Sequence, residues 1–355
     1  MTFIPHSRPL LGVAEAEAAA RAVASGWIAE GPEVAALERE FAARLGVAHA
    51  VAFSSGTAAL TAILAALGVG AGDEVIVPDF ACAALLHAVR PLGAKAVPAD
   101  IDPASLLLDP ADVARRVTPR TRAVVVAHLF GRPARLVPLL RSGVAVIEDC
   151  AQSLGAEPFC TVPPGACGPA AFYSFHATKM IAAGTGGMAV TQSSAFASRL
   201  REIKEYDRRD EAGFRFNFRW SDLGAAVARV QLGRLAHFVA RRREIARRFR
   251  KAFSGLGARL PEEEPSHVYY RFVIDLGRAC GPFLRRARQA GVGCERPVFV
   301  PLHRLSGDPA LPASETAWRR TASIPLYPAL SEEEIGRVIE VVRRLLASPA
   351  AGEED

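Results

Sequence analysis

Lys179 is the residue whose setting points most directly to chemistry. It ends the run Phe-Tyr-Ser-Phe-His-Ala-Thr-Lys, in a chain that prefers arginine and has only four lysines. A position that keeps lysine against that preference favours a group that can lose its proton and form an imine, which a guanidinium cannot do. Asp149 follows a β-branched run thirty residues upstream. A carbonyl-trapping lysine and a buried carboxylate are the pair that pyridoxal phosphate (PLP) requires.

A phosphate site is predicted at residues 54–60, Ser-Ser-Gly-Thr-Ala-Ala-Leu, where a strand leads into a helix. Unpaired amides and the helix dipole at such a start suit an anion, so we expect Gly56, Thr57 and Ala58 to face the phosphate. Gly56 would let the anion approach the backbone. Serine and threonine also cap helices that bind nothing, so this pattern alone leaves both interpretations open.

Four further polar residues complete the predicted site. Asp149 is either a helix cap or the group that keeps the pyridine nitrogen protonated. Gln152 lies within reach of the ring hydroxyl, and the hydroxyl of Ser174 adds to the phosphate site. His176 is either a packed loop histidine or a substrate-binding group. These roles appear in the right order along the chain, and no metal site is expected.

Composition sets the frame for this chemistry. The chain has 355 residues, half of them apolar, and a formal net charge of +6. No apolar run is long enough to span a bilayer, and no signal peptide is recognisable, so we expect a cytoplasmic protein that does not bind membranes. The six cysteines show no zinc-binding spacing. Arginines at 241–251 alternate with apolar residues, which favours a solvated helix face over nucleic-acid binding.

Strands and helices alternate through the first half of the chain, which predicts an α/β fold with a mostly parallel sheet. A single amphipathic helix is expected over 222–253, followed by a smaller α/β unit with a strand at 269–275 and a closing helix at 332–346. We therefore expect a large PLP-binding domain over 1–240, a small C-terminal domain over 241–355, and a disordered tail from 347. The strands expected in the large domain are 48–53, 74–77, 95–99, 122–127, 144–147, 170–175 and 187–191, with helices at 57–67, 81–89, 109–116 and 133–140 between them.

The chain resembles the DegT/DnrJ/StrS-type PLP-dependent sugar aminotransferases, which have the aspartate aminotransferase-like fold type I. The resemblance runs from about residue 26 to residue 330. It implies a PLP imine on Lys179, ring pairing by Asp149, and a homodimer in which Asn217, with Arg219 nearby, reaches into the partner's active site. The motifs that carry it are Gly-Pro-Glu at 31–33, Ser-Gly-Thr-Ala-Ala-Leu at 55–60, Gly-Asp-Glu-Val-Ile-Val-Pro at 72–78, His-Leu-Phe-Gly at 128–131, Glu-Asp-Cys-Ala-Gln at 148–152, Ser-Phe-His-Ala-Thr-Lys at 174–179, Asn-Phe-Arg at 217–219 and Pro-Leu-His at 301–303.

Two positions depart from the family pattern. The family usually stacks an aromatic residue on the PLP ring in a Pro-x-x-Thr-Phe motif, whereas Cys82 stands at that position here and the aromatic moves to Phe80. The family's Gly-Glu-Gly-Gly after the lysine reads Gly-Thr-Gly-Gly at 184–187. The first change leaves the stacking partner open, and the second removes an acid near the site.

The resemblance implies transfer of an amino group from glutamate to a keto group of a nucleotide-linked sugar, in a ping-pong cycle of PLP and pyridoxamine phosphate. Arg219, Arg296 and His303 are the candidates for the cationic wall that binds the diphosphate. The alternatives are a cyclitol aminotransferase that uses glutamine and a non-catalytic PLP-binding relative. Lys179 argues against the family's dehydratases, which have histidine there, and a nicotinamide oxidoreductase would need a Gly-x-Gly-x-x-Gly loop that the chain lacks.

Overall fold

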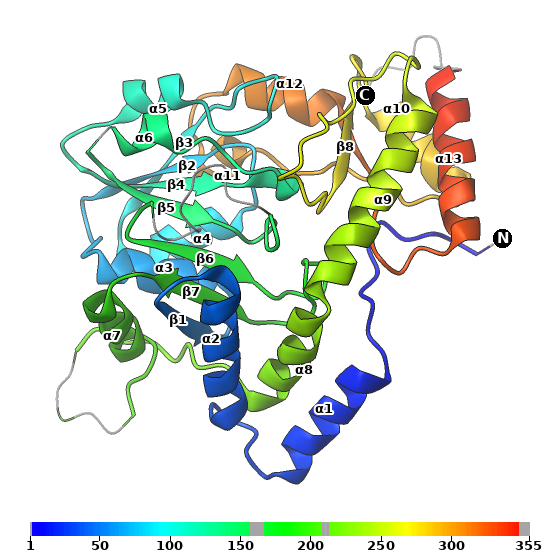
Figure 1. Cartoon of the computed structure of the whole chain (residues 1–355). Coiled ribbons are helices and arrows are strands. Elements are labelled where there is room, and N and C mark those ends of the chain that lie inside the picture. Colours follow the sequence, from blue (N-terminus) through cyan, green and yellow to red (C-terminus); the bar gives the residue numbers. More distant parts are fainter. Residues whose placement is uncertain (1, 142, 157–166, 208–209, 211–212, 348–355) are drawn as a thin grey trace.

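The computed structural model describes residues 2–141, 143–156, 167–207, 210 and 213–347. A seven-stranded sheet forms the body of the molecule, in the order β1-β7-β6-β5-β4-β2-β3 (Figure 1). The strands from β6 through β3 run parallel to one another, and β7 is antiparallel to both of its neighbours. The mostly parallel α/β sheet predicted from the sequence is confirmed. The strand bounds are β1 His49–Phe53, β2 Glu74–Pro78, β3 Lys95–Ala99, β4 Thr121–Ala127, β5 Ala145–Asp149, β6 Ala170–Ser174 and β7 Gly187–Thr191.

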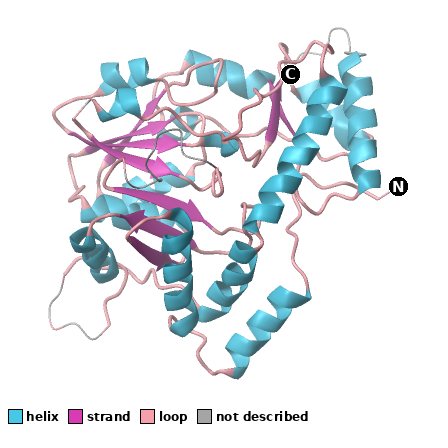
Figure 2. Cartoon of the chain, viewed as in Figure 1, coloured by secondary structure: helices cyan, strands magenta, loops and turns pink. Residues whose placement is uncertain are grey.

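Helices cover both faces of this sheet (Figure 2). Residues of α3, α4 and α7 share one apolar cluster with alternate residues of the strands, and residues of α2, α8 and α9 share a second cluster with the opposite alternation. A third cluster lies under α5 and α6. The helix bounds in this part are α1 Val13–Ala24, α2 Pro32–Leu45, α3 Gly56–Ala66, α4 Ala84–Val89, α5 Pro110–Arg116, α6 Val137–Leu140 and α7 Ser194–Ile203, with 3-10 turns η1 Arg90–Leu92 and η2 Leu129–Gly131.

The single helix expected over 222–253 is wrong in one respect, because the structure divides it. Helix α8 (Asp222–Gly233) ends before Arg234, where φ is −92° and ψ is −2°, and α9 (Leu235–Phe253) begins after it. Gly233 is a weak helix former. The Arg234 guanidinium also binds the carboxylate of Glu15 in α1 at 2.6 Å. The flexible Gly233, followed by Arg234 with its side chain fixed by Glu15, explains the break.

The helix expected over 133–140 is reduced to the four residues of α6. Pro133 and Pro138 both lie in that stretch. Proline lacks the amide hydrogen of a helix interior and disfavours helical geometry in the residue before it. Pro138 therefore fits only in the first turn of a short helix.

The C-terminal part has a core of its own beside the main sheet. Strand β8 (Phe272–Asp275) pairs antiparallel with β9 (Thr321–Ile324), and α9, α10 (Gly281–Gln289) and α13 (Glu332–Ala347) pack around the pair (Figure 1). The short helices α11 (Leu302–Ser306) and α12 (Pro312–Arg320) lie between the two cores. The domain boundary at 240/241 stays a prediction, and the tail from 348 lies outside the described residues. Among the described helices, none is long and apolar enough to cross a membrane.

Candidate active site

The carboxyl ends of β5 and β6 bring the first predicted site residues together. Asp149 is the last residue of β5 and Ser174 is the last residue of β6, and these two strands are paired. Ligands of parallel α/β sheets bind at this edge. Lys179 follows Ser174 in the loop that leads back to β7, and its side chain is half-buried.

The start of α3 makes a close contact with the end of β6. A Cβ atom on Gly56 would lie 3.0 Å from Ser174 Cβ and 3.2 Å from Tyr173 O, so a larger residue would push these segments apart. Gly187 is even tighter, because its Cβ would lie 2.4 Å from Ser55 C. Two glycines therefore let the helix start, the end of β6 and the start of β7 converge.

The first amides of α3 are available to an anion. The first intrahelical bond runs from Ala59 N to Ser55 O, so the amides of Gly56, Thr57 and Ala58 have no acceptor within the helix. Ala58 N instead donates to Ser55 Oγ at 3.0 Å, which caps the helix. Gly56 and Thr57 therefore suit a phosphate better than Ala58 does.

Asp149 lies in an environment that favours a cationic partner. Burial raises the pKa of its carboxyl, and the hydrogen bond from Ala151 N and the charge of Lys179 lower it in part. Its Oδ1 accepts a hydrogen bond from Ala151 N at 2.9 Å, and that contact uses only one of the two oxygens. Burial disfavours the ionised form of this carboxyl, and a protonated pyridine nitrogen beside it would stabilise that form.

Gln152 is oriented by the backbone of η2. Its Oε1 accepts a hydrogen bond from Phe130 N at 2.8 Å. Phe130 has φ of 60°, a left-handed geometry that is uncommon for a bulky residue. Because the amide oxygen is used here, the Gln152 NH₂ group is the part that is left to donate to a ring hydroxyl.

A buried pair behind Asp149 was not predicted. His128 Nδ1 accepts from Ala134 N at 2.9 Å, so its Nε2 hydrogen faces Glu148 Oε2 at 3.2 Å. Cys150 lies close enough that these three side chains resemble a metal-binding group. Burial, however, raises the pKa of Cys150 well above its usual value, which keeps a thiol there in place of a thiolate ligand. The group is best described as packing that supports the end of β5.

The aromatic displaced in the sequence does not reach the site. Phe80 is fully buried and contacts Phe130 edge to face, with 6.3 Å between ring centroids. Its side chain belongs to the core between the main sheet and the C-terminal part. Cys82, by contrast, is exposed. Phe80 is therefore excluded as the residue that stacks on the ring.

Asn217 and Arg219 lie on the chain segment that precedes α8. Phe216 and Phe218 stack at 4.3 Å, and their amides bond to the end of α7 and to Lys204 O. Asn217, between them, is exposed. Arg219 pairs with Asp207 at 2.7 Å and with Glu205 at 3.6 Å.

Arg296 and His303 are engaged within the chain. The guanidinium of Arg296 lies 4.2 Å from the ring centroid of Trp318, and Nε donates to Trp318 O at 3.3 Å. His303 is 3% exposed, and both of its ring nitrogens lie within 3 Å of carboxylate oxygens. This position differs from the open cationic wall expected from the sequence. His176 is exposed, and its Nδ1 contacts Thr178 Oγ1 at 3.1 Å.

Tyr270 is the site residue that sequence reasoning missed. It lies in the loop before β8, and the Lys179 Nζ lies 5.1 Å from its ring centroid. The sequence places Tyr270 inside an expected strand over 269–275, and that pattern contains no sign of a contact with a lysine ninety residues away.

The fold and this arrangement of residues are those of a PLP-dependent transferase of fold type I. The structure superposes on DesV of S. venezuelae, determined in complex with a ketimine intermediate, with a TM-score of 0.88, 34% identity and 95% of each chain covered. The aminotransferase TlmJ from Streptoalloteichus hindustanus gives 0.91 and 34%, over 97% of this chain and 99% of that one. DesI, determined with its TDP-sugar product, gives 0.89 and 29%, over 98% and 93%.

The chain belongs to the DegT/DnrJ/EryC1/StrS aminotransferase family, whose model matches residues 9–343. The predicted resemblance is confirmed, and the protein is an aminotransferase of the PLP-dependent kind. The residues present fit that cofactor, because the close approach at Gly56 and Gly187 forms a helix start open to phosphate. Asp149 and Gln152 at the same sheet edge provide one acceptor and one donor for a ring.

Proposed function

We propose that the protein transfers an amino group from glutamate to a keto group of a nucleotide-linked sugar, in a ping-pong cycle. The observation that carries this proposal is the convergence of Lys179, Asp149 and the start of α3 at one sheet edge, in a chain 29% identical to DesI, which was solved with a TDP-sugar product. When bound, PLP acts as an electron sink that lets an amino group pass from one carbon skeleton to another. The chain's own residues position that chemistry.

We assign the phosphate to the amides of Gly56 and Thr57 and to the hydroxyl of Ser174. Ser174 Oγ accepts weakly from His176 N, at 3.4 Å, so its own hydrogen can still be donated. Asp149 would hold the ring nitrogen protonated, and the Gln152 NH₂ group would bind the ring hydroxyl. Lys179 would carry the cofactor covalently and, once released, move a proton between the two reacting carbons.

Reduction of the PLP-loaded protein with borohydride tests the Lys179 assignment. The label should be fixed on the peptide that contains Lys179, and Lys179→Ala should still bind PLP but lose transamination. Lys204 is the control lysine, and it should stay unlabelled because it is buried and paired with Glu30 at 2.5 Å. Label on Lys204 or Lys95 would refute the assignment.

The two half-reactions can be tested separately by absorbance. Glutamate alone should bleach the band of the PLP form, and a nucleotide-linked ketosugar should then restore it. Initial rates with both substrates varied should give parallel lines, because each half-reaction is complete before the next begins. A band that only glutamine bleaches would favour the cyclitol alternative, and a band that neither donor bleaches would favour a non-catalytic relative.

We also propose a homodimer with shared active sites. The support is the position of Asn217, which is exposed on the surface of its own chain between two stacked phenylalanines. An exposed polar side chain in this position is available to contact a second copy of the chain. Lys179→Ala and Asn217→Ala protomers, each inactive alone, should regain part of the activity when mixed under exchange conditions. Mixed dimers without activity would contradict the shared site.

Our proposed contacts for the substrate's anionic groups remain Arg219, Arg296 and His176. We also propose a cytoplasmic location for the enzyme. Each guanidinium already has a partner, so substrate would have to share or displace Asp207 or Trp318. An Arg296→Gln variant should then raise KM for the nucleotide sugar and leave the glutamate half-reaction unchanged.

A further inference from the structure

Tyr270 lies directly beneath the proposed cofactor lysine. Its side chain is buried, with 6% of its surface exposed, and the Lys179 Nζ lies 5.1 Å from its ring centroid. The negative face of an aromatic ring attracts a cation at this distance. Tyr270 therefore contacts the group on which the proposed chemistry depends.

The backbone around Tyr270 is held in place from two sides. Arg242 in α9 is buried, and its Nη1 donates to the carbonyls of Tyr269 at 3.3 Å and Tyr270 at 3.1 Å. On the other side Gly131 approaches so closely that a Cβ there would lie 2.8 Å from Tyr270 N. Tyr269 has φ of 49°, which is strained for a bulky residue and persists only where the surroundings enforce it. The fold thus maintains a costly geometry at this position.

The charges around the phenol favour its ionised form. Burial raises the pKa of Tyr270, but the charges of Lys179, Arg271 and Arg242 and the hydrogen bond with Thr178 outweigh it and lower the pKa to about 8. The Arg271 guanidinium lies 5.3 Å from the ring centroid. Behind it His6, at 2.9 Å from Arg271, has a pKa lowered to about 3 by burial and by Arg271, so it is neutral and adds no charge.

A hydrogen-bond chain leads from this phenol to the surface. The hydroxyl of Tyr270 lies 3.4 Å from Thr178 Oγ1, which lies 3.1 Å from His176 Nδ1. Thr178 N also points to His176 Nδ1, at 3.3 Å, so that nitrogen is an acceptor and carries no hydrogen. The Thr178 hydroxyl must then donate to His176 and accept from Tyr270. His176 itself is exposed, with its Nε2 hydrogen free of that chain.

We propose that Tyr270, Thr178 and His176 form a proton path between the ring beneath Lys179 and solvent, with Tyr270 as the positioning residue for the lysine. The Tyr270 O–H bond breaks and its proton passes to Thr178 Oγ1, while the Thr178 hydroxyl proton passes to His176 Nδ1. The Nε2 proton of His176 leaves to water, and no electrons are transferred. The phenolate that remains lies beneath the Lys179 ammonium, whose Nζ is over its ring.

The use of this path rests on the proposed function, in which Lys179 must gain and lose a proton in each half-reaction. The Lys179 side chain is half-buried and its Nζ lies over the ring of Tyr270, so a charge on that ring acts on the lysine directly. Loss of the Tyr270 proton along the path places an anion beside the Lys179 ammonium, and its return removes that anion. Its existence can nevertheless be measured without cofactor or substrate.

Ultraviolet titration of the cofactor-free protein tests the coupling. One of the five tyrosines should ionise with a midpoint near pH 8. Tyr270→Phe should remove that step, whereas Tyr269→Phe should leave it, because burial raises the pKa of Tyr269. Lys179→Met should move the midpoint toward the ordinary tyrosine value of about 10. A midpoint that Lys179→Met leaves unchanged would overturn the coupling.

A pH jump followed by phenolate absorbance tests the path itself. Thr178→Val should slow ionisation about tenfold or more, since it removes the hydroxyl that relays the proton, and Thr178→Ser should restore the rate. A merely structural threonine would give equal rates in all three proteins, which would refute the path. If the titration and the jump behave as expected but neither amino donor bleaches PLP, the proton path stands and the proposed function fails. If a donor bleaches PLP but the titration or the jump fails, the path is refuted and the proposed function stands.

Discussion

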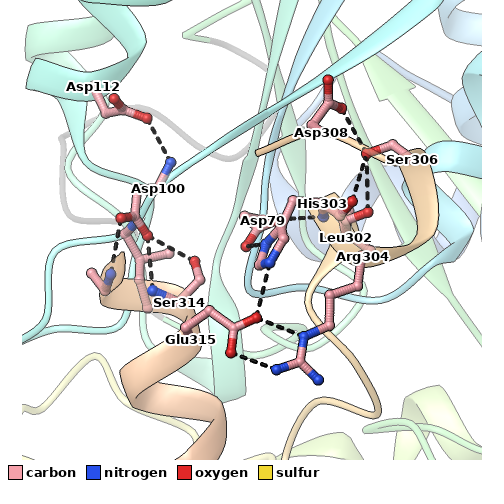
Figure 3. A network of polar contacts seen from close by, with 12 residues as sticks. Asp79, Asp100, Asp112, Leu302, His303, Arg304, Ser306, Asp308, Ser314 and Glu315 are labelled. Atoms are coloured by element: carbon pink, nitrogen blue, oxygen red, sulfur yellow. Dashed lines mark hydrogen bonds and ion pairs between the residues drawn. The ribbon is translucent and has the colours of Figure 1, made fainter. Parts of the chain in front are cut away.

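Replacement of His303 by alanine should destabilise the protein far more than a change at the surface. The ring of His303 lies between two carboxylates (Figure 3): its Nδ1 is 2.8 Å from Asp79 Oδ2 and its Nε2 is 2.9 Å from Glu315 Oε1. The His303 amide also donates to Asp79 Oδ1 at 2.6 Å. Asp79 directly follows β2 and is fully buried. Loss of the ring would leave that carboxylate with the His303 amide and the Ser314 hydroxyl but without the imidazole.

The magnitude follows from this burial. Removing one partner of a buried charged pair costs about 3–5 kcal/mol, because the other group stays desolvated. Arg304 is the matched control, since it binds the same Glu315 from the solvent side at 2.6 Å. An exposed ion pair contributes roughly 0.2–1 kcal/mol, and the contact of Arg304 with Trp318 adds about 0.5–1 kcal/mol. Arg304→Gln should therefore cost less than His303→Ala.

Urea denaturation at several pH values is the assay. Burial raises the pKa of Asp79 in the native protein, and the partial compensation from His303 disappears in the variant. A carboxyl whose folded pKa lies above its unfolded value destabilises as pH rises through the folded pKa, so the deficit of His303→Ala should shrink on acidification. Adding Asp79→Asn should recover part of the loss. A deficit below about 1 kcal/mol, or one independent of pH, would refute this reasoning. A raised KM with normal stability would instead support the substrate-wall role predicted for His303.

Three further outcomes test the cofactor site. Asp149→Asn should weaken PLP binding by roughly 10- to 150-fold in an absorbance titration, since a hydrogen bond to a charged group contributes about 1.5–3 kcal/mol. Asp149→Glu should weaken it less. Equal affinities in all three proteins would mean that Asp149 is only a helix cap. Gly187→Ala should lower both the melting temperature and PLP affinity, while Gly70→Ala, where a Cβ meets nothing within 4 Å, should change neither. Cys82→Phe should tighten PLP by about 0.5–1.5 kcal/mol with a normal melting curve, and unchanged affinity would remove Cys82 from the cofactor face.

The main sheet and its polar edge could be predicted because both are local in sequence. Each β-branched run ends in a polar residue or a turn, and parallel strands bring those ends together whatever the connecting helices do. Asp149 and Ser174 could be placed at one edge in this way. Gly56 could be placed beside them because a helix start follows its strand directly. None of these inferences needs a contact between distant segments.

Except for the helix at 133–140, where two prolines were already visible, the parts that failed depend on contacts that the sequence does not display. The break at Arg234 depends in part on Glu15, more than two hundred residues earlier. Strand β9 has only four residues, Thr-Ala-Ser-Ile, too short and too mixed for an alternation to be recognised. Tyr270 reads as an ordinary strand residue until Arg242 and Gly131 are known to hold it under the lysine. Tertiary packing decided each of these cases.

The C-terminal part reaches the active edge of the main sheet at two separate strands. His303 in α11 holds the residue that follows β2, and Tyr270 lies under the lysine that follows β6. Strands β4 and β5 stand between those two points in the sheet. Cys82, where this chain departs from its family, lies only three residues after Asp79. A change at His303 should therefore disturb the segment around Cys82 before it disturbs Lys179, whereas a change at Tyr270 should act on the lysine first.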